Sequence, residues 1–485
     1  MRIRRVWRTA AVVWLFHAAL LVPIAAAQNP VYPAGPPWRP VPGPDSQGRD
    51  LRGELKNKTT GTFTVTSVGD MFWRTPVAKR MSAALRDVLR SADITVGNLE
   101  GGTGFDPDLT AAAMNDLSFD FLAPGEFGGS PDLQVATQAL NKYGIKMAGA
   151  GADLTTARRP AFQEVAEGLV TFLHACPGDN LCGPRATNTA QGVNPLGVTV
   201  WNTVTQAQFD NLKAMEASIL ARRIEADVVL PTALPPALPA GRMRWLGQNY
   251  VVAEKPGELR HELNRNDEQA LVLAVRNAKE ISDFVMFHMH DHLNRSLFQA
   301  YSHNNYPADF VRPLLHTLID NGLDMYVGSG VHTVQGIEIY KGRPIFYNQG
   351  NIGADLTRGL DSVVDAHGMT RTELTESQRA GFFSDESNSI AYIAHTTYQD
   401  GQLVEIRVYP VDIGLNTRPW SREHVPMTPT PDKARSILER IQKYSEPFGT
   451  QISIENNIGV IRVPPEATLD VGGDLDIPGR RPNRQ

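Results

Sequence analysis

Short apolar runs alternate with amphipathic stretches along most of this 485-residue chain. The apolar runs end in glycine or polar residues and predict strands at 63–68, 94–96, 145–148, 169–174, 284–287, 325–327, 345–347, 390–396 and 404–408. Stretches with apolar residues at helical spacing predict helices at 76–90, 136–143, 266–281, 308–320 and 431–444. Strands that alternate with helices form βαβ units, so the pattern predicts an α/β fold with helices packed on sheet faces.

The helix expected at 266–281 has the most complete set of signals. Asn266 is expected as its N-cap, and Asp267 and Glu268 lie in its first turn, where carboxylates favour the positive end of the helix dipole. Its expected buried stripe is Leu271, Ala274, Val275, Ala278 and Ile281.

Near the C-terminus, Asp400-Gly401 separates two predicted strands and favours a β-hairpin.

The first 27 residues have the pattern of a secretory signal peptide. Four arginines precede an apolar run from Ala10 to Ile24, and Ala25-Ala26-Ala27 provides a cleavage site before Gln28. An uncleaved membrane anchor is the alternative, and the small residues that end the apolar run favour cleavage. The sequence therefore predicts a periplasmic or secreted protein.

Composition and charge narrow the class of ligand. The chain is 42% hydrophobic and 20% charged, as in ordinary globular proteins, and its net charge is −5. This charge gives no indication of nucleic-acid binding. An anionic ligand would be repelled by the overall field, so a local cationic or metal site would have to hold it.

The two cysteines, Cys176 and Cys182, are six residues apart. In an oxidising compartment a disulfide between them is expected, and closing so short a loop contributes about 2.4 kcal/mol at most. A redox or metal-binding pair is the alternative, but the spacing is not C-x-x-C and no histidine follows nearby.

Polar residues gather just after the predicted strands. The residues in these positions are Asp70, Asn98, Glu100, His288, His290, Asp291, His292, His332 and Asn351. Ligands of open α/β sheets bind outside the carboxyl ends of the strands, and nitrogen and oxygen donors suit a hard or borderline divalent metal. Taken singly, each carboxylate or asparagine could equally be a turn or surface residue.

The cluster His288-Met289-His290-Asp291-His292 is the most specific of these signals. Alternate residues of a strand face the same side, so His288, His290 and His292 can point together. Solvated loop histidines are the alternative, but three histidines within five residues after a buried strand favour metal binding or catalysis.

Several motifs together resemble the bacterial capsule-synthesis (CapA, poly-γ-glutamate synthesis) family. They are Val68-Gly69-Asp70, the run from Ala92 to Gly101, Gly144-Ile145 with Ala148 to Gly151, the run from Gly336 to Tyr347 with Gly350-Asn351, and Pro447 to Thr450. The resemblance implies a calcineurin-like metallophosphoesterase-type β-sandwich flanked by helices. It places that core at residues 61–365 and its C-terminal continuation at 366–463. A proline-rich linker at 28–60 and a loose tail at 464–485 are expected to flank them.

The resemblance also implies a site. It makes Asp70, Glu100, His288 and His332 metal ligands and His290 and Asp291 catalytic residues, with Asn98 and Asn351 in support. Two departures reduce the donor set: residues 121–130 lack the family's Asn-Asn-His, and Gly328 to His332 carries Ser329 and Val331 where the family has histidine and proline. One divalent ion is therefore expected rather than two. Glu126 is a candidate replacement for the missing group.

Two functions follow from this comparison. The first is a metal-assisted hydrolase that acts in the synthesis, release or processing of an anionic capsule-like polymer such as poly-γ-glutamate. The second is a non-catalytic protein that binds or exports such a polymer, which the missing motif favours. A purely structural surface protein is a third alternative. The expected partners are an anionic cell-surface polymer or its precursor, and membrane components of a synthesis or export machinery.

Overall fold

The computed structural model describes residues 57–72, 76–100, 106–125, 132–178, 182–225, 237–293, 305–354, 386–414 and 424–464. The expected signal peptide, the linker up to residue 56, Glu126 and the tail beyond residue 464 lie outside these ranges. None of the helices within these ranges is long and apolar enough to cross a membrane.

The chain divides into two compact units. The smaller unit contains residues 198–262, and the larger unit contains the described residues on either side of it. The sequence predicts one continuous core over residues 61–365. The structure instead separates a segment of about 65 residues from the middle of that range.

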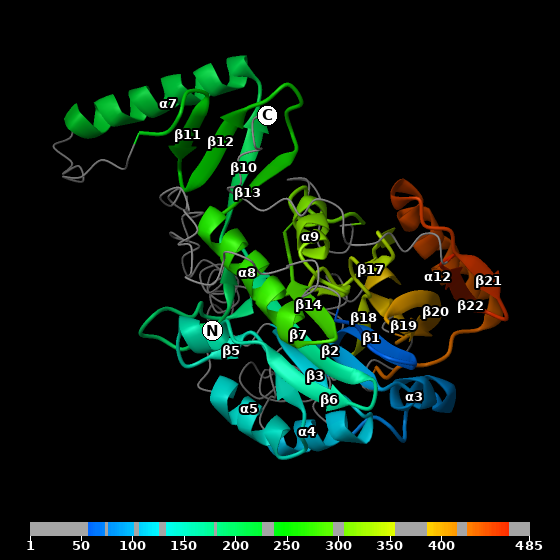
Figure 1. The fold of residues 1–485 in the computed structure, drawn as a ribbon. Helices are drawn as coiled ribbons and strands as arrows, with labels where there is room; N and C mark the ends of the chain where they lie inside the picture. Colours follow the sequence, from blue (N-terminus) through cyan, green and yellow to red (C-terminus); the bar gives the residue numbers. More distant parts are fainter. Residues whose placement is uncertain are drawn as a thin grey trace, which may run out of the picture. The chain divides into compact units, whose positions relative to one another are not determined.

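The larger unit contains a sheet in the order β21-β22-β20-β19-β1-β2-β3-β4, and β18 also pairs with β1 (Figure 1). The strands are β1 (Thr62–Phe72), β2 (Ile94–Glu100), β3 (Phe121–Gly125), β4 (Lys146–Met147), β18 (Asn351–Ala354), β19 (Ile390–Gln399), β20 (Gln402–Asp412), β21 (Ser453–Glu455) and β22 (Ile458–Arg462). Strands β1 to β4 are parallel, so their carboxyl ends share one edge of the sheet.

A second sheet has the order β16-β17-β15-β14-β7-β6, with β9 also paired to β7. Its strands are β6 (Ala161–Val165), β7 (Gly168–Pro177), β9 (Pro195–Leu196), β14 (Phe284–His290), β15 (Met325–Ser329), β16 (Ile337–Tyr340) and β17 (Arg343–Phe346). The central strands β7, β14, β15 and β17 are parallel. The short strands β5 (Ala150–Gly151) and β8 (Gly192–Val193) form a separate pair.

The two sheets share one hydrophobic core. Buried side chains of β1, β2 and β3, such as Phe63, Val96 and Phe121, belong to the same cluster as Phe172 of β7 and Met286 of β14. This arrangement confirms the mixed α/β fold with packed sheets that the sequence predicts. Alternate residues of the strands fill this core, which leaves each sheet an outer face for helices to cover.

Helices cover these outer faces. A second cluster joins the first sheet to α3 (Ala83–Arg90), α4 (Pro107–Asp116) and α5 (Asp132–Asn141). The second sheet is covered by α8 (Arg265–Ile281), which contacts β14 and also α9 (Val311–Asp320). The remaining elements of the larger unit are α6 (Leu154–Ala157), α12 (Pro431–Ser445) and the 3-10 turns η4 (Glu386–Ser389) and η5 (Glu446–Phe448).

The smaller unit is a four-stranded sheet with one long helix. The sheet order is β11-β12-β10-β13, and its elements are β10 (Val198–Val204), α7 (Gln206–Glu225), β11 (Arg242–Trp245), β12 (Gln248–Val252) and β13 (Leu259–Leu263), which ends one residue past the boundary of the unit. Phe209 is the buried anchor near the start of α7, and Trp201 is fully buried in β10.

Two details of the helix at 266–281 differ from the prediction. The helix begins at Arg265, and its N-cap is Asn264, whose side chain accepts hydrogen bonds from the backbone of Asn266 and Asp267. At the other end, Ile281 is 60% exposed because the buried stripe ends at Ala278 and Lys279.

The hairpin expected at Asp400-Gly401 is confirmed: both residues adopt positive φ angles between the antiparallel strands β19 and β20.

Candidate metal centre

Five side chains meet at the carboxyl ends of the parallel strands of both sheets. Asp70 lies on β1, Glu100 ends β2, His290 ends β14, His292 follows β14, and His332 follows β15. They form two overlapping groups, Asp70-Glu100-His290 and Glu100-His292-His332. Within each group the ligand atoms lie within 4.8 Å of one another. Either group supplies the mixture of carboxylate and imidazole that divalent metals accept.

Strand pairing places Asp70 at the centre of this edge. Asp70 is registered with Asn98 of β2 on one side and with Asn351 of β18 on the other. The pairing of β1 shifts between Ser67 and Asp70, which is an irregularity of the kind that redirects side chains near active sites. The carboxylate of Asp70 is fully buried, and its Oδ2 accepts a hydrogen bond of 3.1 Å from the backbone N–H of Gly330.

The amide nitrogen of Asn98 has more acceptors around it than it has protons. Asn98 Nδ2 lies 2.7 Å from Asp70 Oδ1, 2.6 Å from Glu100 Oε2 and 3.1 Å from His290 Nδ1. Its two protons can serve only two of these three atoms. The described atoms therefore provide an excess of electron pairs at this point, which is the condition that a cation satisfies.

The hydrogen bonds of His332 decide which of its nitrogens can bind a metal. Its Nδ1 lies 3.0 Å from Asn351 Oδ1 and 3.2 Å from Asp70 Oδ2, and both of these oxygens are acceptors. Nδ1 therefore carries the proton, and Nε2, which is 4.0 Å from Glu100 Oε1, keeps its lone pair. Asn351 thus orients His332, and its own Nδ2 is held by the carbonyl oxygen of Asn388 at 3.0 Å.

Burial keeps His290 and His292 neutral. It lowers the pKa of His290 and of His292 well below the usual histidine value, and neighbouring histidines lower both further. Burial alone would raise the pKa of Asp70, but hydrogen bonds from His332, Gly330 and Asn98 outweigh it, so the pKa is lowered and the carboxylate is ionised. An ionised Asp70 beside the neutral His290 and His292 supplies deprotonated ligands ready for a metal.

The residues present fit a divalent cation. Asp70 and Glu100 are both fully buried, and the ion-pair partners of Asp70 in the described residues are histidines. Buried negative charges are costly unless a positive charge lies among them. In addition, Asn98 Oδ1 is buried with no hydrogen-bond partner in the described part of the chain, and a Cβ at Gly125 would collide with the side chains of Glu100 and Asn98. Glycine at the end of β3 therefore leaves the space that this site needs.

Comparison with known proteins bears on this site. Residues 239–355, which include His290, His292 and His332, match the family model described as "Bacterial capsule synthesis protein PGA_cap". The chain is related to the bacterial capsule synthesis proteins. The resemblance predicted from the sequence is thereby confirmed.

Three relatives show the range of similarity. The chain is 29% identical over 470 residues to "Uncharacterized protein y4sH" of Sinorhizobium fredii, covering 85% of this chain and 96% of the relative. It is 23% identical over 406 residues to a "Probable polyglutamine synthesis accessory protein" of Mycobacterium tuberculosis, covering 84% and 76%. It is 31% identical over 100 residues to "PGA biosynthesis protein CapA" of Bacillus subtilis, covering 20% and 24%.

Likeness to solved structures is more distant. A hypothetical protein from Thermus thermophilus aligns with 72% of this chain and 99% of its own at 11% identity and a TM-score of 0.34. The fold of the chain is defined by its own two packed sheets.

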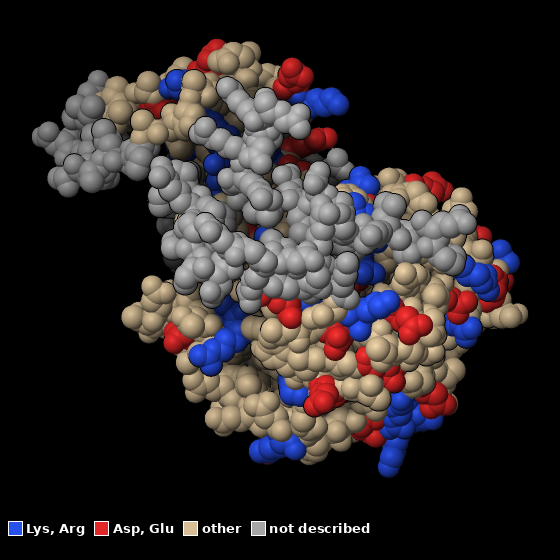
Figure 2. Space-filling view, in the orientation of Figure 1, with Lys and Arg blue, Asp and Glu red and all other residues tan. Residues whose placement is uncertain are grey.

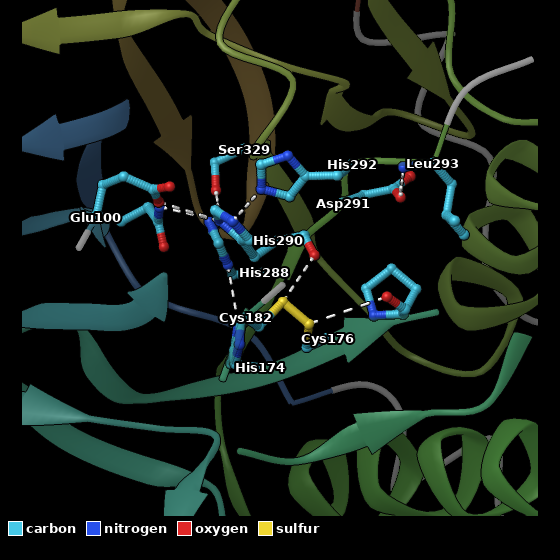
Figure 3. The surroundings of a disulfide bond; sticks show 12 residues. Glu100, His174, Cys176, Cys182, His288, His290, Asp291, His292, Leu293 and Ser329 are labelled. Carbon is cyan, nitrogen blue, oxygen red and sulfur yellow. Dashed lines mark hydrogen bonds and ion pairs between the residues drawn. A yellow bond between two sulfur atoms is a disulfide. The ribbon is translucent and has the colours of Figure 1, made fainter. Parts of the chain in front are cut away.

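His288, which the capsule-synthesis resemblance implies as a ligand, lies deeper in the sheet. Its Nδ1 is 2.9 Å from Nδ1 of His174 on β7, the residue that faces it in the strand register, and the two rings stack (Figure 3). Neither group of possible metal ligands in the described residues includes His288. Among the residues that the structure describes, Nε2 of His174 and Nε2 of His288 are buried with no hydrogen-bond partner.

Asp291 and Ser329 lie at the border of the site. The half-buried carboxylate of Asp291 accepts a hydrogen bond of 2.8 Å from the backbone of Leu293 and lines a small cavity with Ser329, Tyr326 and Asn348. Ser329 lies at the position where the resemblance leads us to expect a histidine, and its hydroxyl is 3.2 Å from His290 Nδ1. The other departure, residues 121–125, forms strand β3, whose terminal Gly125 adjoins Asn98 and Glu100.

Two residues at the site were not assigned a role from the sequence. His292 joins Glu100 and His332 in one group, although the alternation of His288, His290 and His292 indicated only that it could point the same way. His174 was missed completely. Its signal was a single histidine in the largely apolar run from Leu169 to Ala175.

The buried His174 makes a pH-dependent contribution to stability that can be measured. Burial lowers its pKa to about 3, whereas in the unfolded chain the pKa is about 6.5. Between these values the unfolded chain binds a proton that the folded chain does not. Stability therefore falls as the pH drops below about 6.5, by up to about 1.4 kcal/mol per pH unit for this side chain, and this loss is complete near pH 3.

Urea unfolding of metal-free protein between pH 4.5 and 7 tests this contribution. The slope of the unfolding free energy against pH reports how many more protons the unfolded chain binds than the folded chain. In a His174→Asn variant this difference is expected to be smaller by about one proton. An unchanged slope would show that His174 is protonated in the folded protein.

Proposed function

We propose that this protein is an exported, metal-assisted hydrolase that acts on an anionic capsule-like polymer such as poly-γ-glutamate, during its synthesis, release or processing. The relationship to capsule synthesis proteins supports the biological setting. One structural observation carries the chemical part of the proposal. Two fully buried carboxylates and three imidazoles converge at the carboxyl ends of the parallel strands of both sheets, where α/β enzymes bind their ligands.

Asp70, Glu100, His290, His292 and His332 would hold the ion. A divalent ion bound there supplies a Lewis acid that polarises a carbonyl or phosphoryl oxygen and lowers the pKa of a coordinated water. Asn98 orients both carboxylates through its amide, and Asn351 keeps the His332 proton on Nδ1. These hydrogen bonds fix the ligands before any ion or substrate arrives.

His292 is the ligand of this set that lies nearest to the solvent side of the site. It is half-buried, whereas Asp70, Glu100 and His290 are fully buried. Its Nε2 lies 2.7 Å from His290 Nε2, and its ring is 5.4 Å from the His332 ring. Burial and the neighbouring histidines lower the pKa of His292, so its imidazole is deprotonated at neutral pH and its lone pair is available to a metal.

A metal centre would also offset the repulsion between this negatively charged protein and an anionic substrate. The chain has a net charge of −5, and on the face drawn in Figure 2 the described lysines and arginines are interspersed with aspartates and glutamates. A polycarboxylate would meet repulsion at long range. A bound divalent cation provides the local positive charge to which a carboxylate or phosphate oxygen can bind.

The second candidate is a non-catalytic protein that binds or helps to export the same polymer. It is favoured by Ser329, which occupies the position of a family histidine and lies within hydrogen-bonding distance of His290. A hydroxyl with an unperturbed pKa cannot exchange protons near pH 7 as an imidazole does. Metal binding without turnover would be the signature of this function.

Elemental analysis followed by a hydrolysis screen tests the proposal. Purified mature protein is expected to contain about one divalent ion per chain and to hydrolyse either phosphoesters or γ-glutamyl polymers. Treatment with a chelator should abolish turnover, and return of the ion should restore it. Bound metal with no turnover would favour the binding function, and absence of both would contradict the proposed metal centre.

Export predicts a defined mature N-terminus. Cleavage after Ala27 should give a periplasmic or secreted protein that begins at Gln28, because the small residues before this point fit the signal-peptidase site. N-terminal sequencing of the protein from its native compartment checks this. Detection of Met1 on membrane-bound protein would show instead that the apolar run is a retained anchor.

A further inference from the structure

The disulfide expected from the sequence lies directly against the candidate metal centre. Cys176 and Cys182 are joined, with their Cα atoms 6.2 Å apart, and both are almost completely buried. Cys182 Sγ lies 3.4 Å from the backbone carbonyl oxygen of His290, which is a van der Waals contact (Figure 3). The covalent link therefore touches the backbone of a residue that the proposed function makes a metal ligand.

Strand register places the disulfide beside His290. Strands β7 and β14 run in parallel, with His288 facing His174 and Met289 facing Ala175. The next residues along the two strands are His290 and Cys176. At this point β7 turns to pair with β9, and the Cys176 N–H donates to the carbonyl oxygen of Asn194 at 2.9 Å. Cys182 closes back over this end of β7 and contacts the end of β14.

On its opposite side, the end of β14 is held by β15. His290 faces Ser329 in the register of these strands, and the Asp291 N–H donates to the carbonyl oxygen of Ser329 at 2.8 Å. The end of β14 is thus fixed by hydrogen bonding to β15 on one side and by the disulfide on the other. Metal ligands must be held within about 0.5 Å of the binding geometry, so such support affects affinity.

We propose that the Cys176–Cys182 disulfide is a positioning element of the metal centre, which sets the backbone of His290 and thereby the affinity for a divalent ion. This inference rests on the proposed function, because it requires that the site binds a metal. The disulfide does not contact the ion. It acts through the His290 carbonyl, so its loss should weaken binding without removing a ligand.

The test compares metal affinity in matched proteins. Zn²⁺ and Mn²⁺ dissociation constants are measured by competition with a chromophoric chelator for the oxidised wild type, a Cys176→Ser/Cys182→Ser variant and an Ile437→Val variant. Ile437 is buried in α12 and belongs to the shared core without touching the centre, so its change controls for general loss of stability. Reduced wild-type protein with both thiols alkylated by iodoacetamide provides a second form without the disulfide and without free thiol ligands.

The double serine variant and the alkylated protein are expected to bind both ions about 10-fold more weakly than the oxidised wild type, which is the lower end of the range for groups that support metal ligands. The Ile437→Val variant should keep the wild-type dissociation constants. Equal affinity with and without the disulfide would overturn the inference, as would equal weakening in the Ile437→Val variant. If the wild type binds neither ion, the proposed metal centre fails as well, so the two failures are distinguishable.

Discussion

Replacing Asp70 by asparagine is expected to weaken divalent-metal binding by at least about 100-fold, because the loss of a supporting residue alone costs about 10- to 100-fold and Asp70 provides a charged ligand. The change keeps the size of the side chain and removes the negative charge that the site directs at a cation. Hydrolysis, if the protein is catalytic, should be lost together with the metal.

Metal-induced stabilisation measures this effect without any assay of activity. At a free ion concentration 100 times the wild-type dissociation constant, binding should stabilise the wild type by about 2.7 kcal/mol and a variant with 100-fold weaker affinity by about 0.4 kcal/mol. Urea unfolding with and without the ion gives both values.

Asp93→Asn is the matched control for this experiment. Asp93 is exposed near the start of β2 and accepts a hydrogen bond of 2.8 Å from the Thr64 backbone. It should lose at most about 1 kcal/mol of stability and retain wild-type metal affinity. Equal stabilisation of wild type and Asp70→Asn by the ion would place the metal elsewhere in the protein.

His290→Ala and His288→Ala should have opposite effects on metal binding and folding. His290 is in contact with the carboxylates, so its loss is expected to reduce metal affinity by at least about 100-fold. His288 instead contacts His174, so its loss leaves a cavity and an unpaired imidazole. This variant should lose about 2–4 kcal/mol of stability while it still binds the ion.

The two measurements for this pair are metal stoichiometry by elemental analysis and the free energy of urea unfolding in metal-free protein. If His288→Ala lost the metal and His290→Ala retained it, the ligand assignment implied by the family resemblance would hold. The contacts of His290 described above would then be structural.

The fold was predictable because the strands of both sheets are buried. Continuous apolar runs such as 284–287 and 325–327 lie between a core and a covering helix, and their composition shows this directly. Strand β3 was not predicted, because Pro124 and Gly125 interrupt its short apolar run. Its place in the sheet comes from pairing with β2, which the local sequence does not encode.

The choice between neighbouring histidines could not be made from the sequence. His288 and His290 lie on the same face of β14, so alternation alone treats them as equivalent. The decision depends on how far β14 extends relative to β1 and β2 of the other sheet. That offset is a property of tertiary packing. It puts His290 beside Asn98 and leaves His288 facing His174.

The sequence pattern also did not predict that residues 198–262 form a separate unit. Its long helix α7 is exposed on nearly all sides, with apolar residues such as Met215 and Ile219 in solvent, so its sequence shows no apolar stripe that would assign it to a core. The contacts that separate it are long-range pairings, such as that of β10 with β12 across more than 40 residues.

The way in which the chain leaves and re-enters the larger unit makes the smaller unit modular. Gly197 and Asn264 flank it, and the Asn264 N–H donates to the Gly197 carbonyl oxygen at 2.7 Å. To the rest of the protein, residues 198–262 therefore have the topology of a loop whose two ends meet. Loops of this kind tolerate insertion, deletion and exchange, because closing their ends requires little rearrangement. Evolution can therefore vary this unit, or replace it, while the strands that carry Asp70, Glu100 and His290 keep their register.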